Sequence, residues 1–111
     1  RKLDELMQSE KPFLGEDLSL QWLADRMEVP ANHLSQVINQ ESGANFYDFV
    51  NRYRIEEFLE RRRDPSSENL TLLAIALASG FQSKSSFNRT FKRLMGCPPS
   101  QFKDLRSQPA R

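Results

Sequence analysis

The stretch TLLAIALASGFQSKSSFNRTFKRLMG, residues 71–96, decides the fold of this chain. Residues 72–78 are all apolar, and Gly80 follows them as a natural helix stop. Ser83 is a good N-cap, because its side-chain oxygen can accept a hydrogen bond from a free backbone N–H of the next turn. The stretch therefore predicts an apolar helix, a short turn and a second helix over residues 84–95.

The second helix of this stretch has two chemically different faces. Its apolar residues recur at helical spacing and predict a buried stripe, which consists of Phe87, Phe91, Leu94 and Met95. Its other side carries Ser85, Asn88, Arg89 and Lys92. No acidic residue lies between Gly80 and Lys103. Such a face can neutralise phosphates, and an arginine on it can bond guanine twice.

The same pattern occurs once more, earlier in the chain. Five residues of the first copy, Leu20, Leu23, Ala24, Met27 and Val29, match Leu72, Ile75, Ala76, Ser79 and Phe81 at an offset of 52. After the turn, Leu34 and Ile38 match Phe87 and Phe91 at an offset of 53. Each copy has the pattern of a helix-turn-helix motif, whose second helix enters a DNA major groove. Two copies of this pattern indicate helix-turn-helix motifs considerably more specifically than one copy does.

A long helix is expected between the two copies, over residues 46–62. The apolar residues of its first half, Phe46, Phe49, Val50 and Tyr53, cluster on one face. Those of its second half, Ile55, Phe58 and Leu59, fall on roughly the opposite face at about 100° per residue. A helix whose apolar stripe changes sides packs against two different bodies, so this helix is predicted to connect two subdomains.

These patterns predict an all-α fold of seven helices, with two helix-turn-helix subdomains joined by a long connector helix. We expect one DNA-binding domain over residues 1–111. Its parts are a first motif at 18–44, the connector at 45–63, a second motif at 70–96 and a closing helix at 97–106. The first helix is expected at about residues 2–9. The predicted N-caps are Ser19, Asn45, Thr71 and Ser83.

Composition excludes several other classes of protein. The 111 residues are 38% hydrophobic and include eight phenylalanines, which is enough for a core. No apolar run approaches the ~20 residues of a membrane span, and no signal segment opens the chain. The single Cys97 and single His33 cannot form a four-ligand zinc site, and no nucleophile–base set is visible. We therefore expect no cofactor and no enzyme activity, in a reduced, cytoplasmic setting.

Positive charge is concentrated at the C-terminal end of the chain. The net charge is only +1. Residues 1–29 carry four basic and seven acidic side chains, and residues 30–69 carry five and seven. Residues 70–111 carry seven basic side chains and one acidic side chain, Asp104. This asymmetry favours a polyanionic partner.

Three segments together resemble the DNA-binding domain of the AraC/XylS family of bacterial regulators. Residues 77–93, LASGFQSKSSFNRTFKR, resemble that family's second motif, and residues 96–102, GCPPSQF, its closing segment. Residues 33–57, HLSQVINQESGANFYDFVNRYRIEE, resemble the first recognition helix and connector of one branch. The resemblance covers about residues 3–106. It implies seven helices, two DNA-reading helices and a role in activating or repressing transcription.

The chain departs from the family pattern at three places. Glu28 stands in the first turn where the family often has glycine. Pro30 replaces the usual serine or threonine cap of the next helix. Arg61 and Arg62 lie where the connector is often rich in leucine.

We therefore expect sequence-specific binding of double-stranded DNA by two tandem motifs in adjacent major grooves, which regulates transcription. The expected DNA-binding residues are Asn32, His33, Ser35, Gln36, Asn39, Ser83, Lys84, Ser85, Ser86, Asn88, Arg89, Lys92 and Arg93. The expected partners are promoter or operator DNA and RNA polymerase, with no small-molecule site in this fragment. The resemblance also implies an N-terminal sensor or signal-receiving region outside this sequence, through which the full-length protein could be membrane-anchored.

Some alternatives stay open at this point. A helical protein-interaction module without DNA contact is the rival class, and the acid-free basic face argues against it. Arg89 either reads a base or contacts a phosphate, and His33 either approaches DNA or covers the helix hairpin. Trp22 and Cys97 are expected to pack, and the arginines at 61–63 to be solvated at a helix end.

Overall fold

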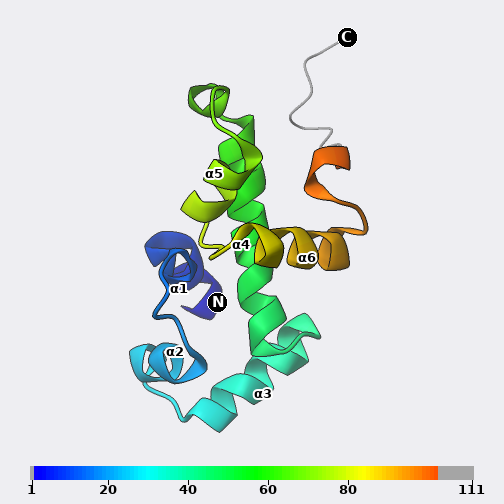
Figure 1. Ribbon diagram of the computed structural model, residues 1–111. Helices are drawn as coiled ribbons and strands as arrows, with labels where there is room; N and C mark the ends of the chain where they lie inside the picture. The colour runs from blue at the N-terminus through cyan, green and yellow to red at the C-terminus, as the bar shows by residue number, and fades with distance from the viewer. Residues whose placement is uncertain (1, 103–111) are drawn as a thin grey trace. The chain divides into compact units, whose positions relative to one another are not determined.

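The structure, a computed structural model, describes residues 2–102, and every regular element in this range is helical (Figure 1). The α-helices are α1 (Lys2–Glu10), α2 (Leu20–Met27), α3 (Ala31–Ser42), α4 (Phe46–Arg63), α5 (Leu72–Ala78) and α6 (Lys84–Met95). Three short 3-10 turns accompany them, η1 (Pro12–Leu14), η2 (Pro65–Ser67) and η3 (Pro99–Gln101). The predicted all-α class is confirmed.

Only part of the predicted seventh helix lies within the described residues. In the described part of residues 97–106, the regular structure is the single turn η3. Residues 103–106 of the expected closing helix, with Lys103 and Leu105, lie outside the described residues. Six α-helices are therefore present in residues 2–102, one fewer than the seven expected for the whole chain.

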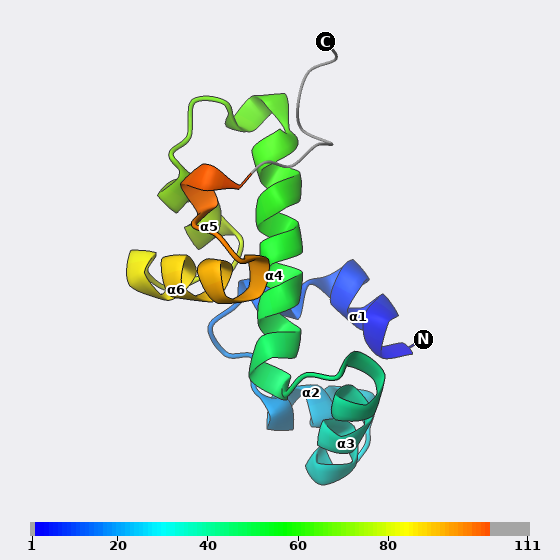
Figure 2. The ribbon, with the colours of Figure 1, turned by 90° about the vertical axis from the view of Figure 1, so that its right-hand side faces the viewer.

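The chain divides into two compact units, Arg1–Tyr53 and Arg54–Arg111, each with its own core. In the first unit, α2 and α3 pack side by side, and Figure 2 shows them as a helical hairpin. Leu23 and Ala24 of α2 and Leu34 and Ile38 of α3 are buried in its core. The predicted apolar stripes of the first motif are therefore its buried faces. The core also includes Leu3, Leu6 and Met7 of α1 and Phe13 of η1.

Tyr53 packs against the core of the first unit and forms a hydrogen bond with α1. Its ring stacks on Phe13, with ring centroids 5.8 Å apart, and meets Phe49 edge-on at 5.2 Å. Its hydroxyl donates a short hydrogen bond to the Asp4 carboxylate. Burial and this hydrogen bond raise the pKa of Tyr53 above its ordinary value, so the phenol keeps its proton and remains a donor.

The two halves of α4 belong to different cores. Phe49 and Val50 are buried in the core of the first unit. Ile55, Phe58 and Leu59 are buried in the core of the second. The change of apolar face that the sequence predicts in this helix is confirmed.

Phenylalanine rings form the centre of the second unit. The Phe58 ring of α4 lies 4.7 Å from Phe87 and 5.8 Å from Phe91 between centroids. Phe81 of the turn meets Phe87 at 5.1 Å, and Phe102 meets Phe91 at 5.5 Å. All four pairs are edge-to-face or tilted, and aromatic quadrupoles favour edge-to-face contacts over a face-to-face sandwich. The face of α6 that carries Phe87 and Phe91 is thereby fixed inward.

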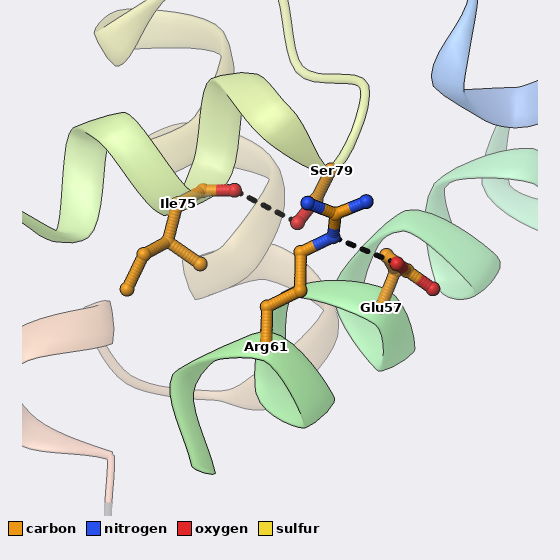
Figure 3. Close-up of polar contacts among 4 residues, drawn as sticks. All are labelled: Glu57, Arg61, Ile75 and Ser79. Atoms are coloured by element: carbon orange, nitrogen blue, oxygen red, sulfur yellow. Dashed lines mark hydrogen bonds and ion pairs between the residues drawn. The ribbon is translucent and has the colours of Figure 1, made fainter. Parts of the chain in front are cut away.

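Arg61, one of the departures from the family pattern, has a partner on its own helix. Its Nε donates to Oε2 of Glu57 at 2.7 Å, one helical turn earlier (Figure 3). The Glu57 side chain is only 10% exposed, whereas that of Arg61 is 39% exposed. A carboxylate at this depth needs an opposite charge or hydrogen-bond donors. Arg61 therefore neutralises a nearly buried carboxylate instead of adding apolar surface.

Candidate nucleic-acid interface

The two helix-turn-helix copies use the same hydrogen bonds to begin their first helices. The side chain of Ser19 accepts from the Trp22 N–H at 3.0 Å, at the start of α2. That of Thr71 accepts from the Ala74 N–H at 3.0 Å, at the start of α5. Each cap satisfies a backbone donor that the helix itself leaves free. The duplication seen in the sequence therefore extends to backbone capping.

The turns after these helices are also equivalent. The Val29 N–H donates to the Ala24 oxygen at 3.0 Å, and the Phe81 N–H donates to the Ala76 oxygen at 3.2 Å. Glu28 in the first copy has φ 61°, in the left-handed region that favours glycine. Its counterpart in the second copy is Gly80, with φ 109°. Glu28 therefore forms the turn in place of glycine at the cost of some backbone strain.

The second helices, α3 and α6, begin differently and end alike. The Ser83 side chain accepts from the Ser86 N–H at 3.1 Å, whereas Pro30 provides no side-chain cap for α3. Both helices end at a glycine with positive φ, Gly43 at 70° and Gly96 at 86°. The predicted cap at Ser83 is confirmed, and this hydrogen bond gives the side chain a structural role besides its predicted contact with DNA.

The outward side of α6 is polar and basic, as predicted. Phe87, Thr90 and Phe91 are buried. Every predicted site residue of this region except Ser86, which is half-buried, is exposed, namely Ser83, Lys84, Ser85, Asn88, Arg89, Lys92 and Arg93. Lys84, Arg89 and Lys92 form no ion pair within residues 2–102. Their charges are therefore available to an external anion.

The outward side of α3 is polar but uncharged. All five predicted residues on it are exposed, namely Asn32, His33, Ser35, Gln36 and Asn39. The Asn32 side-chain oxygen accepts from the His33 backbone N–H at 3.0 Å. His33 is exposed, so its side chain is accessible to an external partner. Each predicted set thus lies together on one helix, the first in the first unit and the second in the second unit.

Gln40 of α3 is also exposed, although it was not among the predicted DNA-binding residues. At the offset of 53 it is the counterpart of Arg93, which was among the predicted residues. The duplication pairs every position of α3 with one of α6, so Gln40 could have been recognised from the sequence as an exposed position.

A groove of about 410 Å³ runs beside α6 in the second unit. Its apolar wall is formed by Leu72, Leu73, Phe87, Pro98 and Pro99, and its polar lining by Lys84, Asn88, Lys92 and Ser100. The lysines place positive charge on one flank of the helix, where no carboxylate lies in the groove lining. This arrangement suits a phosphate group next to the helix.

Two further kinds of feature, a metal-binding cluster and a membrane-spanning helix, are absent from residues 2–102. Among residues 2–102 there is no cluster of three or more His, Cys, Asp or Glu side chains that could hold a metal ion. In the same range, no helix is long and apolar enough to cross a membrane.

The chain is similar to several bacterial regulators. A family model described as "Helix-turn-helix domain" matches residues 23–104. An uncharacterized HTH-type transcriptional regulator of Staphylococcus aureus is 36% identical over 88 residues, which are 79% of this chain but only 11% of that protein. The "Probable transcription factor PqrA" of Proteus vulgaris is 24% identical over 95 residues, 86% of this chain and 75% of that protein.

Solved structures with the same fold agree with these relatives. The C-terminal domain of AraT, a response regulator from Geobacillus stearothermophilus, superposes with a TM-score of 0.71 at 30% identity. The match covers 89% of this chain and 80% of that one. A Listeria innocua protein of unknown function gives a TM-score of 0.67 at 29% identity, covering 88% and 90%. These relatives are named as a transcriptional regulator and a transcription factor, in line with the expectation of a regulator instead of an enzyme. The chain belongs to the AraC-type helix-turn-helix family of bacterial DNA-binding transcription regulators.

Proposed function

We propose that this chain binds double-stranded DNA sequence-specifically through both motifs, with α3 and α6 as recognition helices in successive major grooves. The observation that supports this most is the duplication itself. Two motifs with equivalent caps and turns both leave the polar side of their second helix exposed. The equivalent caps and turns give both second helices the same frame, which supports the same use of both helices.

The two recognition helices contribute different contacts in this proposal. On α6, Lys84 and Lys92 meet phosphates, and Arg89 reads a base, with guanine as its natural partner. On α3, the uncharged side chains meet base edges. Because the two faces differ, the site is asymmetric, unlike the palindrome that a symmetric dimer of single motifs reads.

The length of α4 fits this arrangement. Its 18 residues extend over about 27 Å at about 1.5 Å per residue. Major grooves on one face of DNA recur every ~34 Å. One chain can therefore supply helices to two successive grooves.

The domain is proposed to act within a longer regulator. This chain spans 11% of the length of the first Staphylococcus aureus relative, and the AraT structure is the C-terminal domain of a response regulator. An N-terminal sensor or signal-receiving region, with or without a membrane anchor, would agree with the greater length of the first relative and with the C-terminal position of the AraT domain. The domain itself would act in the cytoplasm at a promoter or operator and contact RNA polymerase there, without a small-molecule site of its own.

Replacement of Arg89 tests both DNA binding and base reading. Arg89→Ala should weaken binding to the preferred duplex by ~1–3 kcal/mol and relax the preference at one or two positions. The measurement is fluorescence anisotropy against a set of single-base variants of the site, with Lys2→Ala on α1 as the control. Equal weakening for every duplex would make Arg89 a phosphate contact. No binding of wild-type protein to any duplex at low salt would favour the protein-interaction module.

A further inference from the structure

The recognition helices differ in the hydrogen-bonding chemistry of equivalent positions. At the offset of 53, Gln36 of α3 is the counterpart of Arg89 of α6, and Asn39 is the counterpart of Lys92. All four side chains are exposed. An amide offers a donor and an acceptor, whereas guanidinium and ammonium groups offer donors only. The first helix therefore presents donor–acceptor pairs where the second presents donors.

The amide of Gln36 is available for an external partner. Neither Gln36 nor Asn39 has a side-chain hydrogen bond to another residue in the described range 2–102. The neighbouring Asn32 differs, because its oxygen already accepts the His33 N–H at 3.0 Å. Gln36 also occupies the middle of the exposed face, one turn after Asn32 and one turn before Asn39 or Gln40. It is thus the side chain best placed to reach a base edge with both of its polar groups.

The charge of the first unit gives it little attraction for phosphates. Residues 1–53 contain five basic and nine acidic side chains, and none of the basic ones lies on α3. Nonspecific affinity comes mainly from the neutralisation of phosphates. Without lysine or arginine, α3 can contribute mainly hydrogen bonds and apolar contacts, and those made to base edges carry sequence information.

Adenine is the base that matches an amide in the major groove. It presents the N7 acceptor beside the N6 donor, whereas guanine presents two acceptors, N7 and O6. We propose that Gln36 reads an adenine in the half-site of the first motif. Its side-chain oxygen accepts from N6–H, and its NH2 group donates to N7. The inference rests on the proposed function, and it assigns adenine to α3 as the counterpart of guanine at Arg89.

A change of specificity at this position is the direct test. The half-site of the first motif is the one whose base preferences remain after Arg89→Ala. Selection from random duplexes with the wild-type chain should enrich an adenine at one position of that half-site. Gln36→Arg should change that base to guanine, because it gives α3 the side chain that α6 carries at the equivalent position. Gln40→Arg is the matched control, since it adds the same charge to the same helix at an exposed position. It should leave the preferred base unchanged.

A modified base supplies a second measurement that needs no new side chain. The analogue 7-deazaadenine lacks the N7 acceptor, so at the selected position it should weaken wild-type binding about tenfold. Gln36→Ala should bind the normal and modified duplexes equally. Three results would overturn the inference: no fixed adenine in that half-site, an unchanged preference with Gln36→Arg, or the same switch with Gln40→Arg. If folded wild-type protein enriched no sequence at all, the proposed function itself would fail.

Discussion

At the scale of single residues, Glu28 shows how the first motif keeps its turn without glycine. Its φ of 61° places its backbone in the left-handed region. This conformation costs a residue that has a Cβ roughly 1–2 kcal/mol. Glu28→Gly removes that strain but loses more entropy on folding, so it should stabilise the first unit by about 0.5–1 kcal/mol. Chemical denaturation measures the change.

The matched control for this position is Glu28→Ala, which removes the same charge but keeps the Cβ. It should give no comparable gain. An equal gain from alanine and glycine would show that charge rather than backbone strain limits stability at this turn.

Lys92 belongs to the basic set on α6 and lines the groove beside that helix. Each phosphate that a protein neutralises contributes about 0.9 to the slope of log K against log salt concentration. Lys92→Ala should therefore lower the magnitude of this slope by about one unit, with similar losses for all sequences. Gln40→Ala on α3, which removes no charge, is the control, and its slope should equal that of the wild type. An unchanged slope for Lys92→Ala would mean that this ammonium meets no phosphate.

At the scale of elements, the start of α6 depends on Ser83. Its side chain caps the Ser86 N–H at 3.1 Å, whereas α3 begins at Pro30 without a side-chain cap. Loss of such a cap costs about 1 kcal/mol. Ser83→Ala should therefore lower the hydrogen-exchange protection of the first amides of α6 about fivefold, as converted from that free energy. Ser85→Ala, two residues later and exposed, should leave protection unchanged, and equal protection in both variants would contradict the role of the cap.

Most helices of this chain follow from local signals that the sequence carries. The caps at Ser19, Asn45, Thr71 and Ser83 were predicted from residue type, and each side chain accepts the expected backbone hydrogen bond. Period and capping are local properties, so they can be read without knowledge of tertiary packing. The predicted recognition faces are exposed for the same reason, because their opposite faces carry the apolar stripes.

Other features depend on tertiary context and could not be predicted. The hydrogen bond between Tyr53 and Asp4 joins residues that lie far apart in the sequence. Glu57 reads as a surface residue of a polar helix, yet its side chain is nearly buried and pairs with Arg61. In each case the surrounding packing decides the outcome, which single-sequence periodicity does not contain.

At the scale of the whole molecule, duplication followed by divergence explains the distribution of charge. The second unit's recognition helix is basic, whereas the first unit's has no lysine or arginine and one acidic side chain, Glu41, within the same hydrogen-bonded frame. Both motifs are thus expected to select bases, but only the second also supplies a basic recognition helix. The second motif should provide most of the salt-dependent binding, and the first should refine the sequence that is chosen.

Hydroxyl-radical footprinting of one chain on its selected site, with the stoichiometry measured in parallel, tests the central claim most directly. We expect protection of the sugar–phosphate backbone that borders two successive major grooves, ~10 base pairs apart on one face of an asymmetric site, at one chain per duplex. Insertion of about five base pairs, half a turn, between the half-sites should abolish the second protected region. Protection of a single groove, or of a palindrome that requires two chains, would contradict the account.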